Sequence, residues 1–159
     1  MNFNFDLFNE DFQYIIPKYD DYGDGTLIYT FSSKDVYIPK TLSTVLKKFY
    51  FFQSLDRKAI NKKLKDFGIK ENGPIFIKSS VFVKAKVRKP KTKSDGAYGY
   101  VNLKAIKFLN EKGGRVIIGL DDGKELEILD RLETISKNIF LAKAMKGAFS
   151  SDESALEVV

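Results

Sequence analysis

The chain has 159 residues, with 27 lysines and arginines against 21 acidic residues, which gives a net charge of +6. This length corresponds to one ordinary domain. Cysteine and histidine are both absent, which excludes Ser-His-Asp and Cys-His catalysis, histidine- or cysteine-ligated metal sites and disulfides. We therefore expect a binding protein and not an enzyme, with no cofactor, no bound metal and no small-molecule substrate.

The charge is distributed unevenly along the chain. Residues 1–39 carry 2 basic and 7 acidic side chains, residues 40–112 carry 19 and 5, and residues 113–159 carry 6 and 9. A strongly basic middle between two acidic ends indicates a polyanionic partner for one region of the surface. The alternative is that these lysines only form a solvated surface. With no signal-peptide pattern or membrane-length apolar run, we expect a cytoplasmic location and no membrane partner.

The N-terminal third predicts a β-hairpin followed by a helix. Strand-like residues 12–17 and 26–31 flank an aspartate- and glycine-rich turn over 20–25. From Thr41 the apolar positions Leu42, Val45, Leu46 and Phe49 fall at helical spacing.

A second, basic amphipathic helix is predicted near 54–67. Its apolar positions include Leu55, Ile60 and Leu64, and Gly68 is suited to end it. The opposite side supplies candidate phosphate contacts at Arg57, Lys58, Lys62 and Lys63. A solvated helix face is the alternative.

The strongest basic cluster lies on a predicted strand over 81–88. Val83, Ala85 and Val87 alternate with Lys84, Lys86 and Arg88, so the basic side chains share one face. Lysines 89, 91 and 93 extend this charge into the following loop. We predict DNA or RNA contact here, with Arg88 as the candidate for insertion into a narrow minor groove.

The remainder predicts an antiparallel meander and a C-terminal helix. Strands begin near Tyr100, and turns are expected at Gly113-Gly114 and Asp122-Gly123. A helix is expected near 131–145. Two residues of the first strand region are further candidates: Tyr98 for base stacking and Asn102 for a base edge, with core packing or backbone capping as alternatives.

The predicted fold is therefore α+β and mainly antiparallel β, with hairpins, a C-terminal meander, and helices near 54–67 and 131–145. We expect one domain over residues 1–146 and an acidic disordered tail over 147–159.

Two family resemblances rest on these motifs. The run Gly99-Tyr100-Val101-Asn102-Leu103-Lys104-Ala105-Ile106, followed by a glycine turn and the Asp122-Gly123 hairpin, resembles the C-terminal half of LytTR-type DNA-binding domains. The order along the whole chain is similar to the ComK competence transcription factor family. The matching segments are Ile16-Pro17-Lys18-Tyr19-Asp20, Phe51-Phe52-Gln53-Ser54 with Arg57-Lys58, Pro74-Ile75 and Asp122-Gly123.

The resemblance implies a sequence-selective transcription regulator that binds paired AT-rich boxes in the minor groove as a homodimer or tetramer. It also implies a DNA contact at Arg131, at the start of the last helix. The complete set of candidate DNA-binding residues is Arg57, Lys58, Lys62, Lys63, Lys84, Lys86, Arg88, Lys89, Lys91, Lys93, Tyr98, Asn102 and Arg131.

Three other functions stay open at this stage. The same basic surface would suit an RNA or single-strand binder, or an adaptor that meets an acidic protein. The third is a carboxylate–metal nuclease, although its candidate aspartates lie in glycine turns, where aspartate is expected for local reasons.

Overall fold

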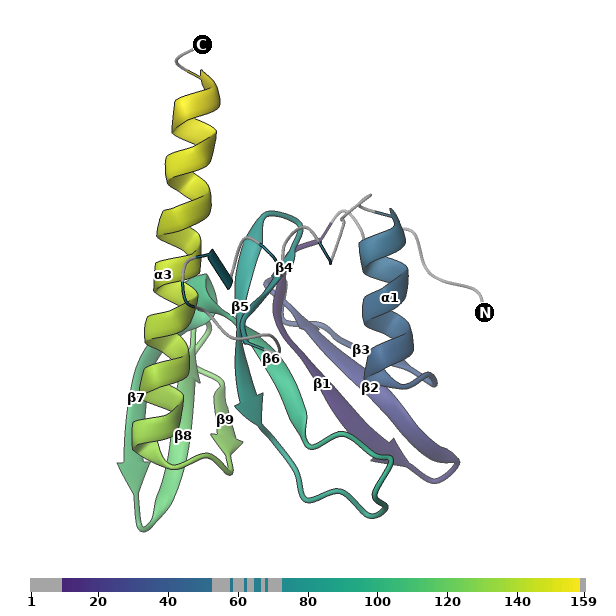
Figure 1. The fold of residues 1–159 in the computed structure, drawn as a ribbon. Coiled ribbons are helices and arrows are strands. Elements are labelled where there is room, and N and C mark those ends of the chain that lie inside the picture. The colour runs from purple at the N-terminus through teal and green to yellow at the C-terminus, as the bar shows by residue number, and fades with distance from the viewer. Residues whose placement is uncertain are drawn as a thin grey trace.

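The computed structural model describes residues 10–52 and 73–157 and, between them, Lys58, Lys62, Lys65, Asp66 and Gly68. Within these residues the chain forms two antiparallel sheets flanked by helices (Figure 1). The predicted α+β class is confirmed. The elements are β1 (Phe12–Asp20), β2 (Gly23–Thr30), β3 (Asp35–Ile38), α1 (Leu42–Phe52), β4 (Ile75–Ile77), β5 (Ser80–Lys86), β6 (Tyr98–Asn102), η2 (Leu103–Ala105), β7 (Ile106–Lys112), β8 (Arg115–Leu120), β9 (Glu125–Ile128) and α3 (Leu132–Glu157).

The larger sheet has the strand order β3-β2-β1-β6-β5-β4. Its β1–β2 hairpin confirms the prediction over 12–31, and the pair Asp20–Gly23 closes the turn. Gly23 has a φ of 137°, which side-chain-bearing residues rarely adopt. Strand β6 joins β1 to β5, so the basic strand lies next to the centre of the sheet.

The smaller sheet, β7-β8-β9, contains the later strands of the predicted meander, whereas the first predicted strand, β6, pairs with β1 and β5 in the larger sheet. The turn after Lys112 uses Gly113 and Gly114 with φ of 57° and 78°, the left-handed pair that a two-residue hairpin needs. Phe108, on β7, lies over Gly119 on β8, where a side chain would overlap its ring.

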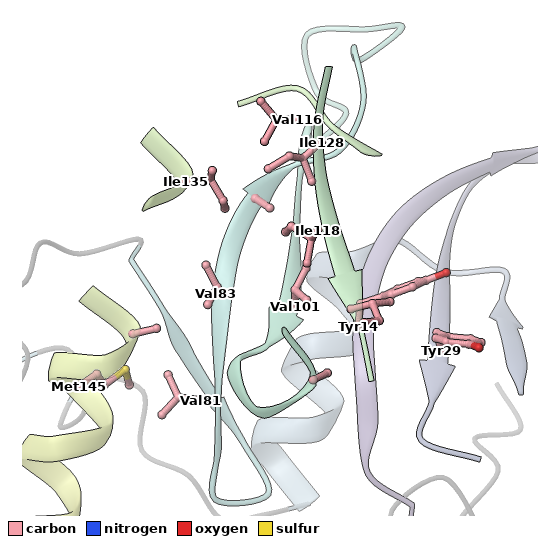
Figure 2. Close-up of a cluster of buried hydrophobic side chains, with 14 residues drawn as sticks. Tyr14, Tyr29, Val81, Val83, Val101, Val116, Ile118, Ile128, Ile135 and Met145 are labelled. Carbon is pink, nitrogen blue, oxygen red and sulfur yellow. The ribbon is translucent and has the colours of Figure 1, made fainter. Parts of the chain in front are cut away.

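The main core lies between the two sheets and α3. Figure 2 shows Val83 and Val101 of the larger sheet facing Ile118 of the smaller one, with Ile135 of α3 alongside. All four side chains are buried. Because both sheets and α3 contribute to one apolar cluster, the basic strand β5 is held from behind by this core.

The opposite face of the larger sheet is covered in part by α1. Val45 and Phe49 of α1 are fully buried against Phe12, Ile15 and neighbouring residues, and the Phe12 and Phe49 rings meet edge to face at 5.3 Å. Thr41 accepts a hydrogen bond from the backbone N–H of Thr44 at 3.4 Å, as an N-terminal cap does. Within the described residues, Phe82 is the residue of β5 that joins this cluster.

The C-terminal helix is longer than predicted. The helix α3 continues to Glu157, so residues 147–157, expected as a disordered tail, have a helical backbone here. No proline interrupts this stretch, and its alanine, leucine and glutamate residues favour helix. The basic helix predicted near 54–67 falls mostly outside the described residues. Of its positions Lys58, Lys62, Lys65 and Asp66 are described, in helical conformation.

No described helix is both long enough and apolar enough to cross a membrane.

Candidate nucleic-acid interface

Strand β5 alternates as the sequence predicted. Val83 and Ala85 are fully buried in the main core, whereas Lys84 and Lys86 lie half-buried on the other face. The register pairs Lys84 with Tyr100 and Lys86 with Tyr98, so the two lysines lie beside two tyrosines. Strands β5 and β6 therefore bring basic and aromatic side chains together at this end of the sheet.

Lys84 and Tyr98 form a defined pair. The ammonium nitrogen of Lys84 lies 4.4 Å from the centroid of the Tyr98 ring, a cation–π distance. Tyr98 is 42 % exposed, so the ring is open to a ligand despite this contact. Burial lowers the pKa of Lys84 from its ordinary value, and the charge of Asp130 opposes that shift.

Beyond its pairing with the short strand β4, the outer edge of β5 is covered by residues 129–130 and by α3. Asn138 donates to the carbonyl of Lys84 at 3.0 Å, and the backbone N–H of Leu129 donates to the carbonyl of Lys86 at 2.7 Å. The N–H of Lys86 donates to Asp130 at 2.6 Å. These bonds fix the backbone beneath both lysines and protect the edge from unwanted pairing. They also bring Arg131, which is exposed, to this end of the sheet.

Arg88 occupies a different environment from the one predicted, because β5 ends at Lys86. Its guanidinium forms a two-pronged ion pair with Asp24, with distances of 2.6 and 2.9 Å, and its Nε donates to the carbonyl of Gly96 at 2.7 Å. The Arg88 side chain is only 11 % exposed. Hydrogen bonding to Asp24 raises the pKa of Arg88 further above its ordinary value.

Arg88 is thus a clamp within the protein. The prediction that it inserts into a minor groove does not fit this geometry, because its donors already bond Asp24 and Gly96. An arginine fork matches a carboxylate as well as it matches a phosphate. The sequence offered no means of telling which of the two it would meet.

The loop that joins β5 to β6 is tied to the β1–β2 hairpin through Tyr19. The Tyr19 hydroxyl donates to Asp95 at 2.6 Å and accepts from the backbone N–H of Lys91 at 2.8 Å. The Arg88 guanidinium carbon lies 4.0 Å from the centroid of the Tyr19 ring, and the Lys91 ammonium 4.5 Å. Sequence reasoning missed Tyr19 and Asp24 as the residues that hold this loop.

The fixed loop leaves its lysines at the surface. Lys89, Lys91 and Lys93 are all exposed, and Lys89 and Lys93 make no ion pair within the described part of the chain. We refer to Lys84, Lys86, Lys89, Lys91 and Lys93 as the β5–β6 lysine cluster. A groove of about 470 Å³ runs beside it, between the start of α1 and Tyr98.

Some lysines outside this cluster pair with acidic residues from the two end regions of the chain. Lys104 pairs with Asp11 at 3.0 Å, and Lys107 pairs with Asp121 at 3.1 Å. Such exposed pairs contribute little stability, but they reduce the charge available to a ligand. The β5–β6 lysine cluster is therefore one concentration of the basic excess in residues 40–112, and the basic residues of 40–70 carry another share of it.

Five further candidates are not part of the β5–β6 lysine cluster. Asn102 is 1 % exposed; it donates to the carbonyl of Phe12 and caps η2 by accepting from Lys104 N–H, so the prediction of a base contact is wrong and the capping alternative is correct. Lys58 and Lys62 are exposed. Arg57 and Lys63 lie outside the described residues.

In the part of the chain that the structure describes, no three acidic side chains are grouped closely enough to hold a metal ion.

Comparison with known proteins found no family model, no curated protein and no solved structure that matches this chain.

Proposed function

We propose that this protein is a ComK-like transcription regulator that binds AT-rich duplex DNA as a dimer or higher oligomer in the cytoplasm. The observation that supports the proposal is the β5–β6 lysine cluster: two lysines on β5 and three exposed lysines in the loop that follows it. Phosphate contacts by such lysines supply affinity that does not depend on base sequence. The sequence resemblance to the ComK and LytTR families points in the same direction.

The geometry favours one direction of approach. Asp20 and Asp21 lie in the β1–β2 turn and repel phosphates, whereas Lys84 and Lys86 lie two strands away on β5. The sugar–phosphate backbone of the DNA therefore passes over β5, and the loop 87–97 faces the minor groove of the DNA. Since Arg88 is engaged with Asp24, the lysines of this loop are the cations that a narrow AT-tract groove attracts.

Fluorescence anisotropy with labelled duplexes tests this function. Affinity for an AT-rich duplex will fall steeply as salt rises, and Lys89→Ala and Lys93→Ala will each reduce the slope of log K against log salt by about 1. Lys34→Ala is the matched control, because this exposed lysine follows β2 at the opposite end of the sheet. An affinity that does not change between low and physiological salt would contradict the proposal.

Exposed Tyr98 beside Lys84 favours one second candidate, a single-strand or RNA binder, because a free aromatic face stacks on unpaired bases. Competition between duplex and single-stranded probes separates the two functions. Tighter binding of the single strand, lost in Tyr98→Ala, would replace the duplex proposal.

A further inference from the structure

A second groove, of about 620 Å³, lies between α3 and β7. None of the residues that line it belongs to the β5–β6 lysine cluster. Its lining combines apolar side chains, including Ile106 and Ile139, with a set of four lysines: Lys104, Lys107, Lys143 and Lys146. Its ligand must therefore combine apolar and acidic groups.

The lysines of this groove are not equivalent. Lys104 and Lys107 pair with Asp11 and Asp121, whereas Lys143 and Lys146 of α3 are exposed and form no ion pair within the described residues. Two uncompensated cations beside an apolar surface make the α3 side of the groove the place for an acidic partner.

The helix α3 itself carries the complementary charge. Residues 137–146 contain Lys137, Lys143 and Lys146 and no acid, whereas residues 147–157 contain Asp152, Glu153 and Glu157 and no base. The backbone is helical through both halves, and the distal half projects beyond the two sheets (Figure 1). At 1.5 Å per residue, Glu157 lies about 15 Å beyond Gly147 along a continuous helix. The acidic half therefore cannot reach the groove of its own chain.

We propose that two copies of this protein associate through antiparallel α3 helices, each placing its acidic segment 147–157 along the α3–β7 groove of the other. A two-fold axis between the helices sets each basic half against an acidic half, so both contacts are attractive. A parallel arrangement would instead bring like charges together.

A neighbouring stripe of α3 suits a close helix–helix contact. Phe140, Ala144 and Gly147 are exposed and follow the spacing i, i+4, i+7, which places them on one helix face next to the groove. Phe140 is 69 % exposed, so this face of the helix carries a large apolar side chain in contact with solvent. Small residues at 144 and 147 let a second helix backbone approach, and Phe140 then becomes buried.

The inference deepens the proposed function by naming the contact that makes the dimer. Association is measured without DNA, so its failure is distinct from failure of DNA binding.

Sedimentation velocity of the full chain over a range of concentrations tests the proposal. We expect a reversible dimer that is weakened on the order of 100-fold by Lys143→Glu with Lys146→Glu, because several attractive contacts become repulsive in each dimer. Asp152→Lys with Glu153→Lys will weaken it similarly. An equimolar mixture of these two variants will associate as tightly as the original chain, since both contacts in the mixed dimer are again attractive.

Lys47→Glu with Lys48→Glu, on the exposed face of α1, is the matched control and will leave association unchanged. Circular dichroism establishes that each variant is folded. A chain that stays monomeric, a dimer insensitive to both charge reversals, or a mixture that fails to associate would each overturn the proposal. Charge reversals that lower DNA affinity but leave self-association unchanged would also overturn the proposal, because the α3–β7 groove would then bind phosphates.

Discussion

The ion pair between Arg88 and Asp24 allows a sharp test of how the β5–β6 loop is held. Arg88→Ala removes two charged hydrogen bonds to Asp24 and one to the Gly96 carbonyl. It also leaves a carboxylate that is only 15 % exposed without its partner. Removing one member of a fully buried pair costs about 3–5 kcal/mol. Because this pair keeps some access to solvent, we expect a loss of about 2–3 kcal/mol, or about 4–12 °C in Tm for a domain of this size.

A double-mutant cycle measured by urea unfolding isolates the pair. Arg88→Ala and Asp24→Ala will each destabilise the protein, whereas the double variant will cost about as much as one single variant, since no uncompensated charge remains. The coupling energy will then be about 2 kcal/mol. A coupling below about 0.5 kcal/mol would refute the assignment of Arg88 as a clamp.

DNA binding provides an independent measurement on the same variants. Because Asp24 already neutralises Arg88, Arg88→Ala will leave the salt slope of DNA affinity unchanged, in contrast to Lys89→Ala. A drop of about 1 in that slope would show that Arg88 contacts a phosphate, and the reasoning from the ion pair would then be wrong.

Two other predictions concern the scaffold. At Gly99 an added Cβ would lie 2.6 Å from the Ile16 Cγ2 and 3.0 Å from its Cα, so Gly99→Ala will push β6 away from β1 and cost about 1–3 kcal/mol in urea unfolding; an unchanged midpoint would contradict this packing. A hydrogen bond from Tyr29 holds the pKa of Asp122 well below its usual range. The stability that this carboxylate contributes is therefore fully present above about pH 4 and is lost as the pH falls below that value. Asp122→Asn will destabilise the protein at pH 7. The variant will then lose less further stability than the unsubstituted chain as the pH is lowered to about 2. An acid-unfolding profile parallel to that of the unsubstituted chain would contradict the role of Asp122.

Local patterns were enough to predict most elements. The alternation of Val83 and Ala85 with lysines predicted which face of β5 is buried, because successive side chains of a strand point to opposite faces whatever packs against them. Turn glycines such as Gly113 and Gly123 predicted where the hairpins turn, since few other residues adopt their φ values. The charge count similarly located the basic segment.

The length of α3 was not predictable from the same kind of signal. Acidic, serine-containing residues 147–157 are typical of a disordered tail, yet the structure continues the helix through them. Composition reports the average tendency of a segment, whereas helix propagation depends on the turn that precedes it. The preceding turn here is anchored by Ala142 and Met145 in the main core.

The sequence by itself determined which residues are basic, where they cluster along the chain and which strand face they share. Only the tertiary structure decided which of them remain open to a ligand. Arg88 forms an ion pair with Asp24, and Lys104 forms one with Asp11; both partners are more than sixty positions away in the sequence. The side chain of Asn102 donates a hydrogen bond to the Phe12 carbonyl. Such partners are set by which strands lie side by side, and strand order arises from packing of the whole core, which no local pattern encodes.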